Sequence, residues 1–564
     1  MNVFFSMVQG VSFELERDGS LLVRMPTREL KLEGPSVPFI VNELFPLLKR
    51  NHHLAFIEGK LKNAPPGYLQ EILAKLEAVG IIHRCCYNGE RTVTEDSTLI
   101  KETLQHNPAP VLITARYHYS LNQLLPIAKV IADKIVLQEV LSSQSSFIKD
   151  WTLLKKDAGE PVIPYVITAQ YQWRTRGQIH LGYCSGKGLT LQQAEISAAG
   201  EAAERYTACC YSAEELTYAS YNNVKEKSLD PRQLVLYLPE QYSKLPFKPF
   251  KEDLVLGWVN GYSLVYNKPI LIPAIAVFLD YRLQNENENF AEMQSSGLAA
   301  GSSLANAIVA GTLEVIERDA FMNTWYNRLP CGKIDIRTHP SADIIKLFTN
   351  YQELGVQLHL LKLPTDAPCH VFMAIAVGSS EGGPFIAVGL GSGFSVTAAS
   401  TGALLEVAQV RASSNNYYKH PVTLQRIKEL VEHPELVNTI NDHRLLYATP
   451  DHAAAFDFLF ASPLIPFEWD KPLAKEADHA LKELVSYLHE ADSDLVYYNL
   501  GMPETESAGY FSCRVILPGF QPLHFGYHNM RLAGRRLYEL PIQPGFKKIL
   551  SSANTLHNYP HPLA

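Results

Sequence analysis

Two segments of this chain share one arrangement, in which a glycine-rich approach leads into an alanine-rich helix that carries the pattern Glu-x-x-Glu-Arg. The first is SGKGLTLQQAEISAAGEAAERY at 185–206, and the second is SSGLAAGSSLANAIVAGTLEVIERDAFMNTW at 295–325. Thr190 and Gln193 form a capping-box pattern, which predicts that the first helix begins there. One such helix alone is typical of a solvated surface. Because the arrangement occurs twice, we predict that both helices contribute to one site.

The acidic side chains of each segment fall on one helical face. Residues at positions i, i+4 and i+7 of a helix lie within about 60° of one another. Carboxylate and hydroxyl oxygens grouped in this way suit Mg²⁺. The second helix is otherwise apolar, so we expect it to be buried, where acidic groups need partners or metal ions. The grouped residues are Ser197, Glu201 and Glu204 in the first helix, and Asn306, Ala310, Glu314 and Glu317 in the second.

Charge arithmetic favours a metal-bound nucleotide at this site. The four glutamates carry −4, and the two arginines that follow them reduce this to −2. ATP would add about −4, which a partly dry site cannot sustain, whereas about two Mg²⁺ ions with Lys187 and Arg411 would bring the total near zero. The predicted metal ligands are Glu201, Glu204, Glu314 and Glu317, and the two arginines are Arg205 and Arg318.

Other cofactor motifs do not fit the sequence. A di-iron bundle needs Glu-x-x-His, whereas both helices carry Glu-x-x-Glu-Arg. The segment 182–188, GYCSGKG, is one residue short of a Walker A motif, and Gly188 replaces its Ser or Thr. The GxGxG at 389–393 lacks the dinucleotide spacing. We interpret it as a turn before a third helix, within 389–411, where Glu406 and Gln409 share a face.

Residues 1–90 predict a winged-helix-like module. Asp18-Gly19 is a strong hairpin signal, and helices are expected within 37–50 and 69–80. The module has ten basic and ten acidic residues, whereas a DNA-groove reader normally carries a basic face. Capture of an extended peptide along a sheet edge is the favoured use. DNA binding and plain structural packing are the alternatives.

The remaining chain divides into a linker with a small α/β adaptor segment at 91–170, a large α/β catalytic domain at 171–545 and a proline-containing tail at 546–564.

The net charge of −8 argues against a bulk nucleic-acid binder. The longest nearly apolar run, 269–279, is about half the length of a membrane helix. Eight cysteines without zinc-site spacing are expected to be buried, inert thiols. We therefore expect an α/β (α+β) cytoplasmic protein with neither a nucleic-acid nor a membrane partner.

The three helical segments, in their order, resemble the signatures of the YcaO family. The matching residues are SGKGLTLQQAEISAAGEAAER, SGLAAGSSLANAIVAGTLEVIERDA and LLEVAQVR, and 441–459 and 516–526 are similar to later family segments. The resemblance covers about 171–564. It implies a YcaO-type catalytic domain that uses ATP and Mg²⁺ to activate a peptide backbone amide. Residues 1–90 similarly resemble the peptide-clamp, or leader-recognition, domains of ribosomal-peptide modifying systems.

The resemblance also implies roles for individual residues. Arg318, Arg411 and Gln409 would be catalytic. Ser302 and Asn306 stand where many members carry Asn and Glu, and because both keep an oxygen donor, we expect altered metal affinity and retained activity. The implied cofactor-binding set is Lys187, Ser197, Glu201, Glu204, Arg205, Ser302, Asn306, Glu314, Glu317, Arg318, Glu406, Gln409 and Arg411.

The implied reaction is cyclodehydration of a ribosomally made precursor peptide. A Cys, Ser or Thr side chain attacks the preceding carbonyl, the resulting oxygen is phosphorylated, and elimination leaves a thiazoline or oxazoline. The alternatives are thioamide or amidine formation with an external nucleophile, and a non-catalytic leader-binding docking subunit. The resemblance further implies a flavin-dependent dehydrogenase and an adaptor protein as partners. A homodimer is a separate expectation.

The end of the chain departs from the family pattern. Azoline-forming members commonly end in PxPxP, whereas this chain ends Pro560-His561-Pro562-Leu563-Ala564. Proline presets the backbone φ angle. We therefore expect a stiff tail that enters its own active site and helps to organise it.

Overall fold

The computed structural model describes the chain almost completely from residue 147 onward and in parts before it. In residues 2–87 it describes strands together with Leu73 and Leu76. The other described residues are 116, 118–124 and 147–563, apart from 157–159, 176–177, 379–383, 419, 471–476, 544–545 and 547–550.

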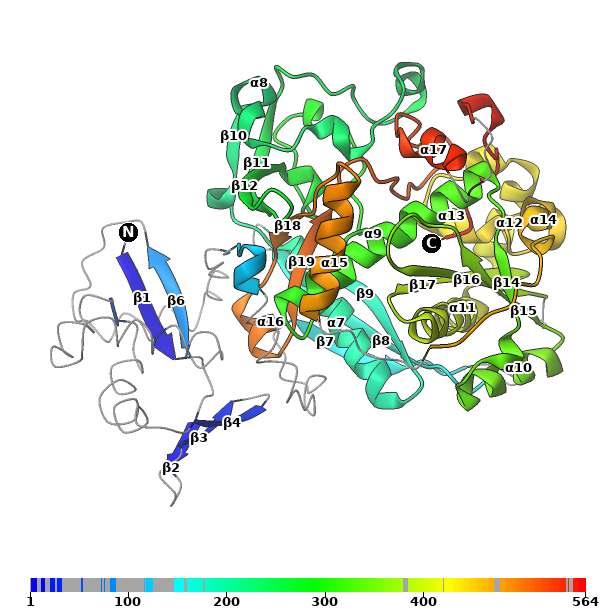
Figure 1. The fold of residues 1–564 in the computed structure, drawn as a ribbon, viewed down its shortest axis with the longest axis horizontal. Coiled ribbons are helices and arrows are strands. Elements are labelled where there is room, and N and C mark those ends of the chain that lie inside the picture. The colour runs from blue at the N-terminus through cyan, green and yellow to red at the C-terminus, as the bar shows by residue number, and fades with distance from the viewer. Residues whose placement is uncertain are drawn as a thin grey trace.

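Three sheets form the framework of the body, and every pairing between their strands is antiparallel (Figure 1). Their strand orders are β7-β8-β9, β10-β11-β18-β19-β13 with β12 on β11, and β14-β15-β16-β17. Together with the helices, these sheets confirm the α+β fold class. The strands are β7 Ile148–Leu153, β8 Tyr165–Thr175, β9 Gln178–Gly188, β10 Thr217–Ser220, β11 Val255–Ser263, β12 Lys268–Pro273, β13 Leu298–Gly301, β14 Gly332–Ile334, β15 Gln357–Leu363, β16 His370–Val377, β17 Ile386–Gly393, β18 Val496–Asn499 and β19 Phe511–Ile516.

Helices cover the faces of these sheets. The helix α7 packs on β8 and β9, α9 on β13 and β19, and α11 on β16 and β17. The α-helices of the body are α7 Leu191–Cys209, α8 Tyr221–Val224, α9 Leu304–Asn327, α10 Ala342–Glu353, α11 Val396–Tyr418, α12 Pro421–Glu432, α13 Ile440–Leu445, α14 Asp457–Phe460, α15 Ala477–Glu490, α16 Pro503–Ser507 and α17 Arg536–Glu539.

One local unit, a strand followed by a two-residue turn and a long helix, occurs three times, as β9–α7, β13–α9 and β17–α11. The capping box predicted at Thr190 is confirmed at the start of α7. Ser303 caps α9 by accepting a hydrogen bond from the main-chain N–H of Asn306 at 3.1 Å. The first N–H of α11, on Val396, donates to the carboxylate of Asp470 at 2.9 Å. Polar caps thus fix where all three helices begin.

Glycines in these strands let the helices approach closely. A Cβ added to Gly186 would lie 2.0 Å from the main-chain nitrogen of Ala198 in α7, and one on Gly389 would lie 2.2 Å from that of Val407 in α11. The GxGxG at 389–393 therefore lies in β17, and its role here is helix–strand packing. The interpretation of these glycines as a turn was wrong, although the helix after them was predicted.

The expectation of a buried second helix is confirmed for α9. Trp325 and Phe321 of this helix are at most 1% exposed and belong to the largest apolar cluster of the described residues. Asp319 is 1% exposed, and both of its carboxylate oxygens accept hydrogen bonds from Arg536 of α17. The last residue of the Glu-x-x-Glu-Arg-Asp run is therefore used to hold α17 against α9.

The described strands near the N-terminus confirm the predicted hairpin. β2 (Ser12–Leu15) pairs with β3 (Leu21–Met25), Leu15 opposite Leu21. The turn itself and the helix predicted within 37–50 lie outside the described residues. Of the helix predicted within 69–80, the structure describes the two buried leucines. The other strands here are β1 Asn2–Met7, β4 Arg28–Leu32, β5 His52–His53 and β6 Ile82–Tyr87.

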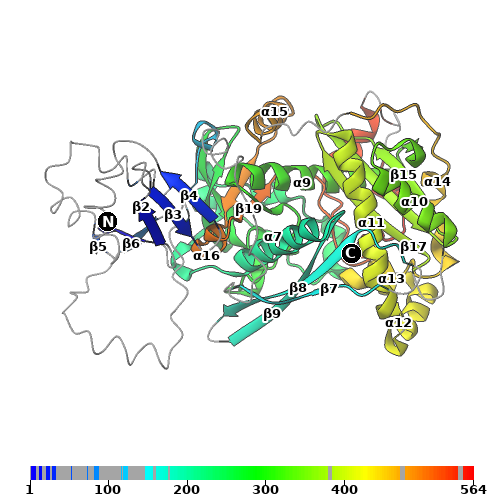
Figure 2. The ribbon, with the colours of Figure 1, turned by 90° about the horizontal axis from the view of Figure 1, so that it is seen from below.

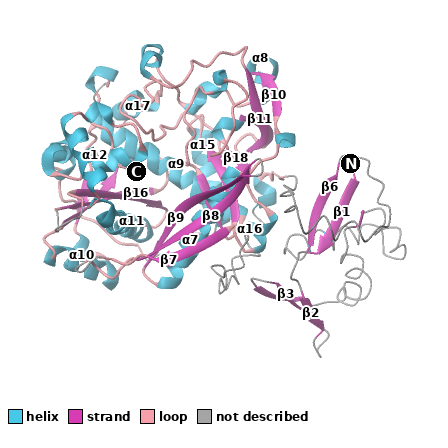
Figure 3. Cartoon of the chain, turned by 180° about the vertical axis from the view of Figure 1, so that it is seen from behind, coloured by secondary structure: helices cyan, strands magenta, loops and turns pink. Residues whose placement is uncertain are grey.

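The boundary predicted at residue 170 falls inside β8. Because β8 pairs with both β7 and β9, the strands β7 and β8 share a sheet with β9, the strand that leads into α7. The β8–β9 pair is prominent in the view from behind (Figure 3). None of the helices in the described ranges is long and apolar enough to cross a membrane.

The described residues 560–563, near the end of the C-terminal tail, are buried in the body. Trp325 donates a hydrogen bond from its indole to the main-chain carbonyl of Tyr559 at 2.9 Å. His443 of α13 stacks on His561, with ring centroids 4.1 Å apart. Both views in Figures 1 and 2 place the C-terminal end within the body, beside α13. The expectation that the tail enters the active site and helps to organise it stays a prediction.

Three buried histidines in this region predict acid sensitivity of the fold. Burial lowers the pKa of His443 to about 4, and it lowers the pKa values of His524 and His561 far below their ordinary range. The unfolded chain takes up these protons near pH 6.5, so stability is fully present above that pH and is lost as the pH falls toward 4. We expect a loss of about 3 kcal/mol from His443 alone by pH 4.

Thermal melts across this pH window test the expectation. His443→Gln should flatten the pH dependence, whereas His479→Gln, at a mostly exposed histidine of α15, should leave it unchanged. A melting temperature of the wild-type chain that stays constant from pH 7 to pH 4 would contradict the assignment of neutral buried histidines.

Candidate active site

A cavity of about 650 Å³ lies where α7, α9 and α11 converge. Its walls also include the end of β9 and the turn between β13 and α9. The three strand–helix units therefore meet at one place, and they include the two helices that the repeated motif predicts to contribute to one site. The predicted residues that line the cavity are Lys187, Ser197, Glu201, Glu204, Arg205, Ser302, Glu314, Arg318, Glu406 and Gln409.

Three predicted residues are not part of the cavity wall. Asn306 donates a hydrogen bond to the hydroxyl of Ser302 at 2.9 Å and so supports a residue that does line it. Glu317 is 7% exposed and forms an ion pair with Arg318 at 3.3 Å. Arg411 is fully buried and lies behind α11.

Side chains of α11 hold the end of β9 beside the cavity. Lys187 forms an ion pair with Glu406, Nζ to Oε2 2.7 Å. This lysine, together with Arg318, outweighs burial and lowers the pKa of Glu406. The amide of Gln409 donates to both the hydroxyl and the main-chain carbonyl of Ser185, at 2.8 and 3.0 Å.

Each glutamate pair is bridged by its own arginine over long distances. Arg205 lies 3.5 Å from both Glu201 and Glu204, and Arg318 lies 3.4 Å from Glu314. Burial, followed by the neighbouring carboxylates, raises the pKa of Glu204 well above its ordinary value despite Arg205. Carboxylates crowded in this way gain stability from added positive charge.

Burial also raises the pKa of Glu317, to about 7, with further contributions from Glu406 and Glu314. Arg514 of β19 supplies positive charge near the carboxylates of Glu314 and Glu204. Its guanidinium is fully buried and donates to the main-chain carbonyls of Ala276 at 2.8 Å and Ser296 at 2.7 Å. Burial lowers the pKa of Arg514 to about 10, so it remains a cation at neutral pH.

The residues of the cavity fit ATP with Mg²⁺. Among the described residues no group of three or more His, Cys, Asp or Glu side chains is arranged to hold a metal ion by itself. Mg²⁺ in nucleotide sites is held by one or two carboxylates together with phosphate oxygens, so a cavity with separated carboxylates suits a metal that arrives with the nucleotide. Glu201, Glu204 and Glu314 are the cavity-lining carboxylates from α7 and α9 that could hold it.

The structure corrects the role predicted for Arg411. Its guanidinium donates to Glu160 at 3.1 Å and to the main-chain carbonyls of Gly378 and Pro384 at 3.0 and 3.2 Å, and it lies 5.9 Å from the ring centre of Tyr351. These contacts hold α11 from the side away from the cavity. Arg411 is therefore a positioning residue for the side chains of α11.

We expect Arg411→Lys to lower ATP turnover about tenfold, because lysine cannot reproduce the forked contacts and α11 would shift. Glu160→Gln keeps a hydrogen-bond acceptor for Arg411 and should have a smaller effect. The ATP dependence of phosphate release measures both variants. A direct role in nucleotide binding would instead be indicated if Arg411→Lys weakened ATP binding without changing the turnover at saturation.

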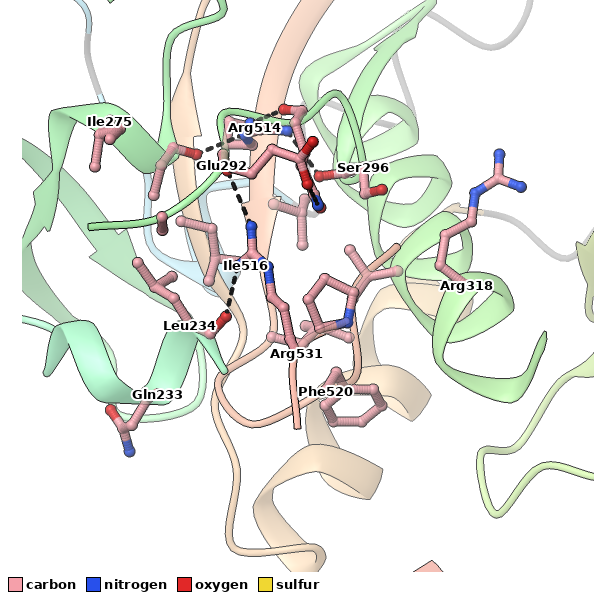
Figure 4. A pocket seen from close by; sticks show the side chains of 17 residues that line it. Gln233, Leu234, Ile275, Glu292, Ser296, Arg318, Arg514, Ile516, Phe520 and Arg531 are labelled. Atoms are coloured by element: carbon pink, nitrogen blue, oxygen red, sulfur yellow. Dashed lines mark hydrogen bonds between the residues drawn. The ribbon is translucent and has the colours of Figure 1, made fainter. Parts of the chain in front are cut away.

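A second, smaller cavity of about 90 Å³ lies near Arg514 and Arg531 (Figure 4). Its walls are mostly apolar. Arg531 donates to the main-chain carbonyls of Leu234 and Glu292, at 3.1 and 3.0 Å, so this arginine, like Arg514, is used to hold loops. In Figure 4 the guanidinium of Arg318 points away from this cavity. The larger cavity is therefore the better candidate site.

Several residues that line the larger cavity were not predicted from the sequence. Ser185 lies inside a quoted motif, and its alternation with Lys187 along a strand is a signal that could have identified it. Arg444, Ser413 and Tyr510 also line the cavity. They come from distant segments, and no local pattern connects them with the glutamate helices.

The described cysteines are buried, as expected. Burial raises the pKa values of Cys210, Cys331 and Cys369 to about 12, so these are neutral thiols at pH 7. They offer no reactive thiolate to the site. The full set is Cys184, Cys209, Cys210, Cys331, Cys369 and Cys513.

Comparison with known proteins assigns the family. Residues 185–521, more than half of the chain, match the family model described as YcaO cyclodehydratase, ATP- and Mg²⁺-binding. The chain belongs to the YcaO family. The match begins at Ser185, within β9, and includes all three helices of the cavity. ATP and Mg²⁺, named in the family description, are the two cofactors predicted from the sequence.

This YcaO protein is also similar to curated and solved proteins. An uncharacterized protein of Methanothermobacter thermautotrophicus is 31% identical over 232 residues, which cover 41% of this chain and 57% of that protein. The chain spans about half the length of the curated relatives it matches.

Two solved structures share the fold of this YcaO protein. A heterocyclase in complex with substrate and cofactor superposes with a TM-score of 0.56 and 19% identity, over 79% of this chain and 57% of that one. The heterocyclase TruD superposes with a TM-score of 0.51 and 16% identity over 100% of both chains. At these identities the likeness supports the fold.

Proposed function

We propose that this YcaO protein is an ATP- and Mg²⁺-dependent cyclodehydratase that acts on a ribosomally made precursor peptide and forms thiazoline or oxazoline rings from Cys, Ser or Thr residues. The observation that supports this most is the single cavity lined by Glu201, Glu204, Glu314, Lys187 and Arg318. Both solved neighbours named above are heterocyclases. The precursor peptide as substrate belongs to this proposal.

The residues of the cavity have separate roles in the proposed reaction. Bound ATP with Mg²⁺ would supply the phosphoryl group that converts the amide oxygen into a leaving group. Arg318 offsets negative charge on one wall, and Lys187, oriented by Glu406, does so on another. Gln409 fixes Ser185 and with it the wall of the cavity. Positioning and fixed charges of this kind carry most of the catalysis in phosphoryl transfer.

Delivery of the peptide is assigned to residues 1–90. A module that holds the leader would raise the effective concentration of the reacting segment at the cavity. Removing residues 1–90 should therefore weaken precursor binding at least tenfold while Mg·ATP binding is kept. Calorimetry with each ligand checks both halves. Loss of both precursor binding and Mg·ATP binding in the truncated protein would contradict the assignment of separate modules.

The function is tested by mixing the purified protein with ATP, Mg²⁺ and a candidate precursor, such as a short Cys/Ser/Thr-rich peptide encoded beside the gene. We expect phosphate release and the loss of one water mass per ring. An exchange of oxygen for sulfur would indicate thioamide formation instead, and gain of an amine would indicate an amidine. Phosphate release without a change in peptide mass would indicate a missing partner, such as the adaptor. Absence of Mg·ATP binding would indicate a docking subunit.

A further inference from the structure

The strand β9 has one edge that faces away from its partner. In the described residues β9 pairs with β8 alone. The main-chain N–H of Ser185 donates to Glu201 at 3.3 Å, and its C=O accepts from Gln409 at 3.0 Å. Both groups therefore point away from β8 and toward the cavity.

The same orientation holds for alternate residues along the strand, because main-chain groups alternate in direction with a period of two. On β8 the main-chain groups of Val166 and Gln172 bond toward β7, to Leu154 and Phe147. Even-numbered residues of β8 thus face β7, and odd-numbered ones face β9. In the pairing register the odd-numbered residues of β8 lie opposite even-numbered residues of β9. The N–H and C=O groups of Leu181 and Tyr183 therefore face the open edge, as those of Ser185 do.

The side chains of this stretch are exposed and apolar. Ile179, Leu181 and Tyr183 are 54%, 52% and 68% exposed. Gln170 donates to the hydroxyl of Tyr183 at 2.6 Å and so holds this ring over the sheet. Figure 2 shows β9 at the lower margin of the molecule, with its first residues extending beyond α7. An open edge with apolar side chains is a liability that proteins usually cover, which indicates that it is used.

We infer that the open edge of β9 from Ile179 to Tyr183 binds the reacting region of the substrate peptide as an added strand. The inference rests on the proposed function and names the part of the chain that guides the peptide to the cavity. Continuity with the cavity decides the occupant. Leu181 and Ser185 are about 13 Å apart along the strand, so a peptide paired at Leu181 and Tyr183 enters the cavity within about four residues.

Peptide addition to a sheet edge explains both features of this stretch. Main-chain hydrogen bonds provide affinity without demanding a particular sequence, and neighbouring side chains provide preference. The exposed Leu181 and Tyr183 would favour apolar or aromatic residues in the flanks of the reacting residue. A peptide cannot pair with the edge at Ser185, because the main-chain N–H and C=O of Ser185 already bond to Glu201 and Gln409.

Hydrogen exchange on the full chain tests this inference. The probe is a pool of synthetic dodecapeptides with a central cysteine and randomised flanks, added in excess with Mg²⁺ and a non-hydrolysable ATP analogue. We expect exchange of the Leu181 and Tyr183 amides to slow about tenfold, while the amides of Gly182 and Cys184, already bonded to β8, change little. The same pool with N-methylated flanks should give no protection, because it cannot complete the strand pairing.

Matched variants extend the test. Tyr183→Pro removes an N–H that faces the open edge without removing a bond to β8, and Tyr183→Ala removes the ring but keeps the N–H. We expect Tyr183→Pro to weaken pool binding about tenfold more than Tyr183→Ala does. Equal binding by the two variants would overturn the inference.

Other outcomes are equally decisive. Protection of Leu181 and Tyr183 that depends on protein concentration in the absence of peptide would overturn the inference, because the edge would then pair with a second copy of the chain. If the pool forms rings in a parallel reaction with ATP but does not protect these amides, the inference is overturned while the proposed function is supported. Protection by the pool with no ring formed on any peptide in that reaction would support the edge as a peptide site and would contradict ring formation by this chain alone.

Discussion

Replacing Glu314 by glutamine should lower ATP turnover about a hundredfold or more, since a fixed charged group at a phosphoryl-transfer site contributes this much. Glutamine keeps an oxygen that can accept the hydrogen bond from the main-chain N–H of Gly297, which Glu314 accepts at 3.2 Å. It removes the negative charge that faces Arg318 and that would hold Mg²⁺. The fold should therefore persist while the chemistry is lost.

The control is a glutamate of α7 that does not line the cavity. Glu195→Gln removes the same charge elsewhere on the helix that carries Glu201, and its phosphate release should match the wild type. Melting temperatures of both variants show whether the fold is kept. A Glu314→Gln variant that retains turnover within about twofold would exclude this carboxylate from the reaction.

Replacing Gly186 by alanine should destabilise the body by about 3 kcal/mol, the upper end of the usual cost of overpacking. The added Cβ would meet main-chain atoms of α7 at 2.0 and 2.3 Å, on Ala198 and Ala194. Main-chain atoms cannot move away as the end of a flexible side chain can. The strand β9 and the helix α7 must therefore move apart to accept the added Cβ. Because Ser185 and Lys187 flank this glycine, Mg·ATP binding should weaken as well.

Gly200→Ala is the matched control, on α7, the helix that Gly186 contacts. Its Cβ would come no closer than 3.6 Å to Tyr510, which is ordinary contact distance. Alanine favours a helix over glycine by about 1 kcal/mol, so this variant should be as stable as the wild type or more so. Chemical denaturation measures both. Equal stability of the two variants would show that the strand–helix contact at Gly186 tolerates expansion.

The elements that local patterns specify were predicted from the sequence. The capping box at Thr190, the apolar face of α9 and the same-face spacing of Glu201 and Glu204 depend on residues within a few positions of each other, and the structure has each of them. The occurrence of two Glu-x-x-Glu-Arg helices predicted their convergence without showing how they meet.

Features that depend on distant residues could not be predicted in the same way. Arg411 has a favourable charge for a phosphate site, but its partner Glu160 lies 251 positions earlier and draws the guanidinium away from the cavity. Asp470 caps α11 from 74 positions later. Arg514 lies in a strand whose sequence does not distinguish a buried cation from an exposed one.

The glycines of β17 illustrate a third difficulty. A glycine-rich stretch before a helix is typical of a turn that binds phosphate, and it is equally typical of a strand pressed against a helix. The choice between them depends on how closely Val407 approaches Gly389, which is a tertiary contact. At 389–393 the structure has the second arrangement.

The location of the metal tests the central claim most directly, namely that carboxylates from separate helices bind a metal-loaded nucleotide in one cavity. Crystals grown with Mn²⁺ and a non-hydrolysable ATP analogue would reveal the metal by its anomalous scattering. We predict an anomalous peak inside the cavity, coordinated by carboxylates of α7 or α9 and by phosphate oxygens. A nucleotide and metal bound elsewhere, with Glu204 and Glu314 still bridged only by their arginines, would contradict it.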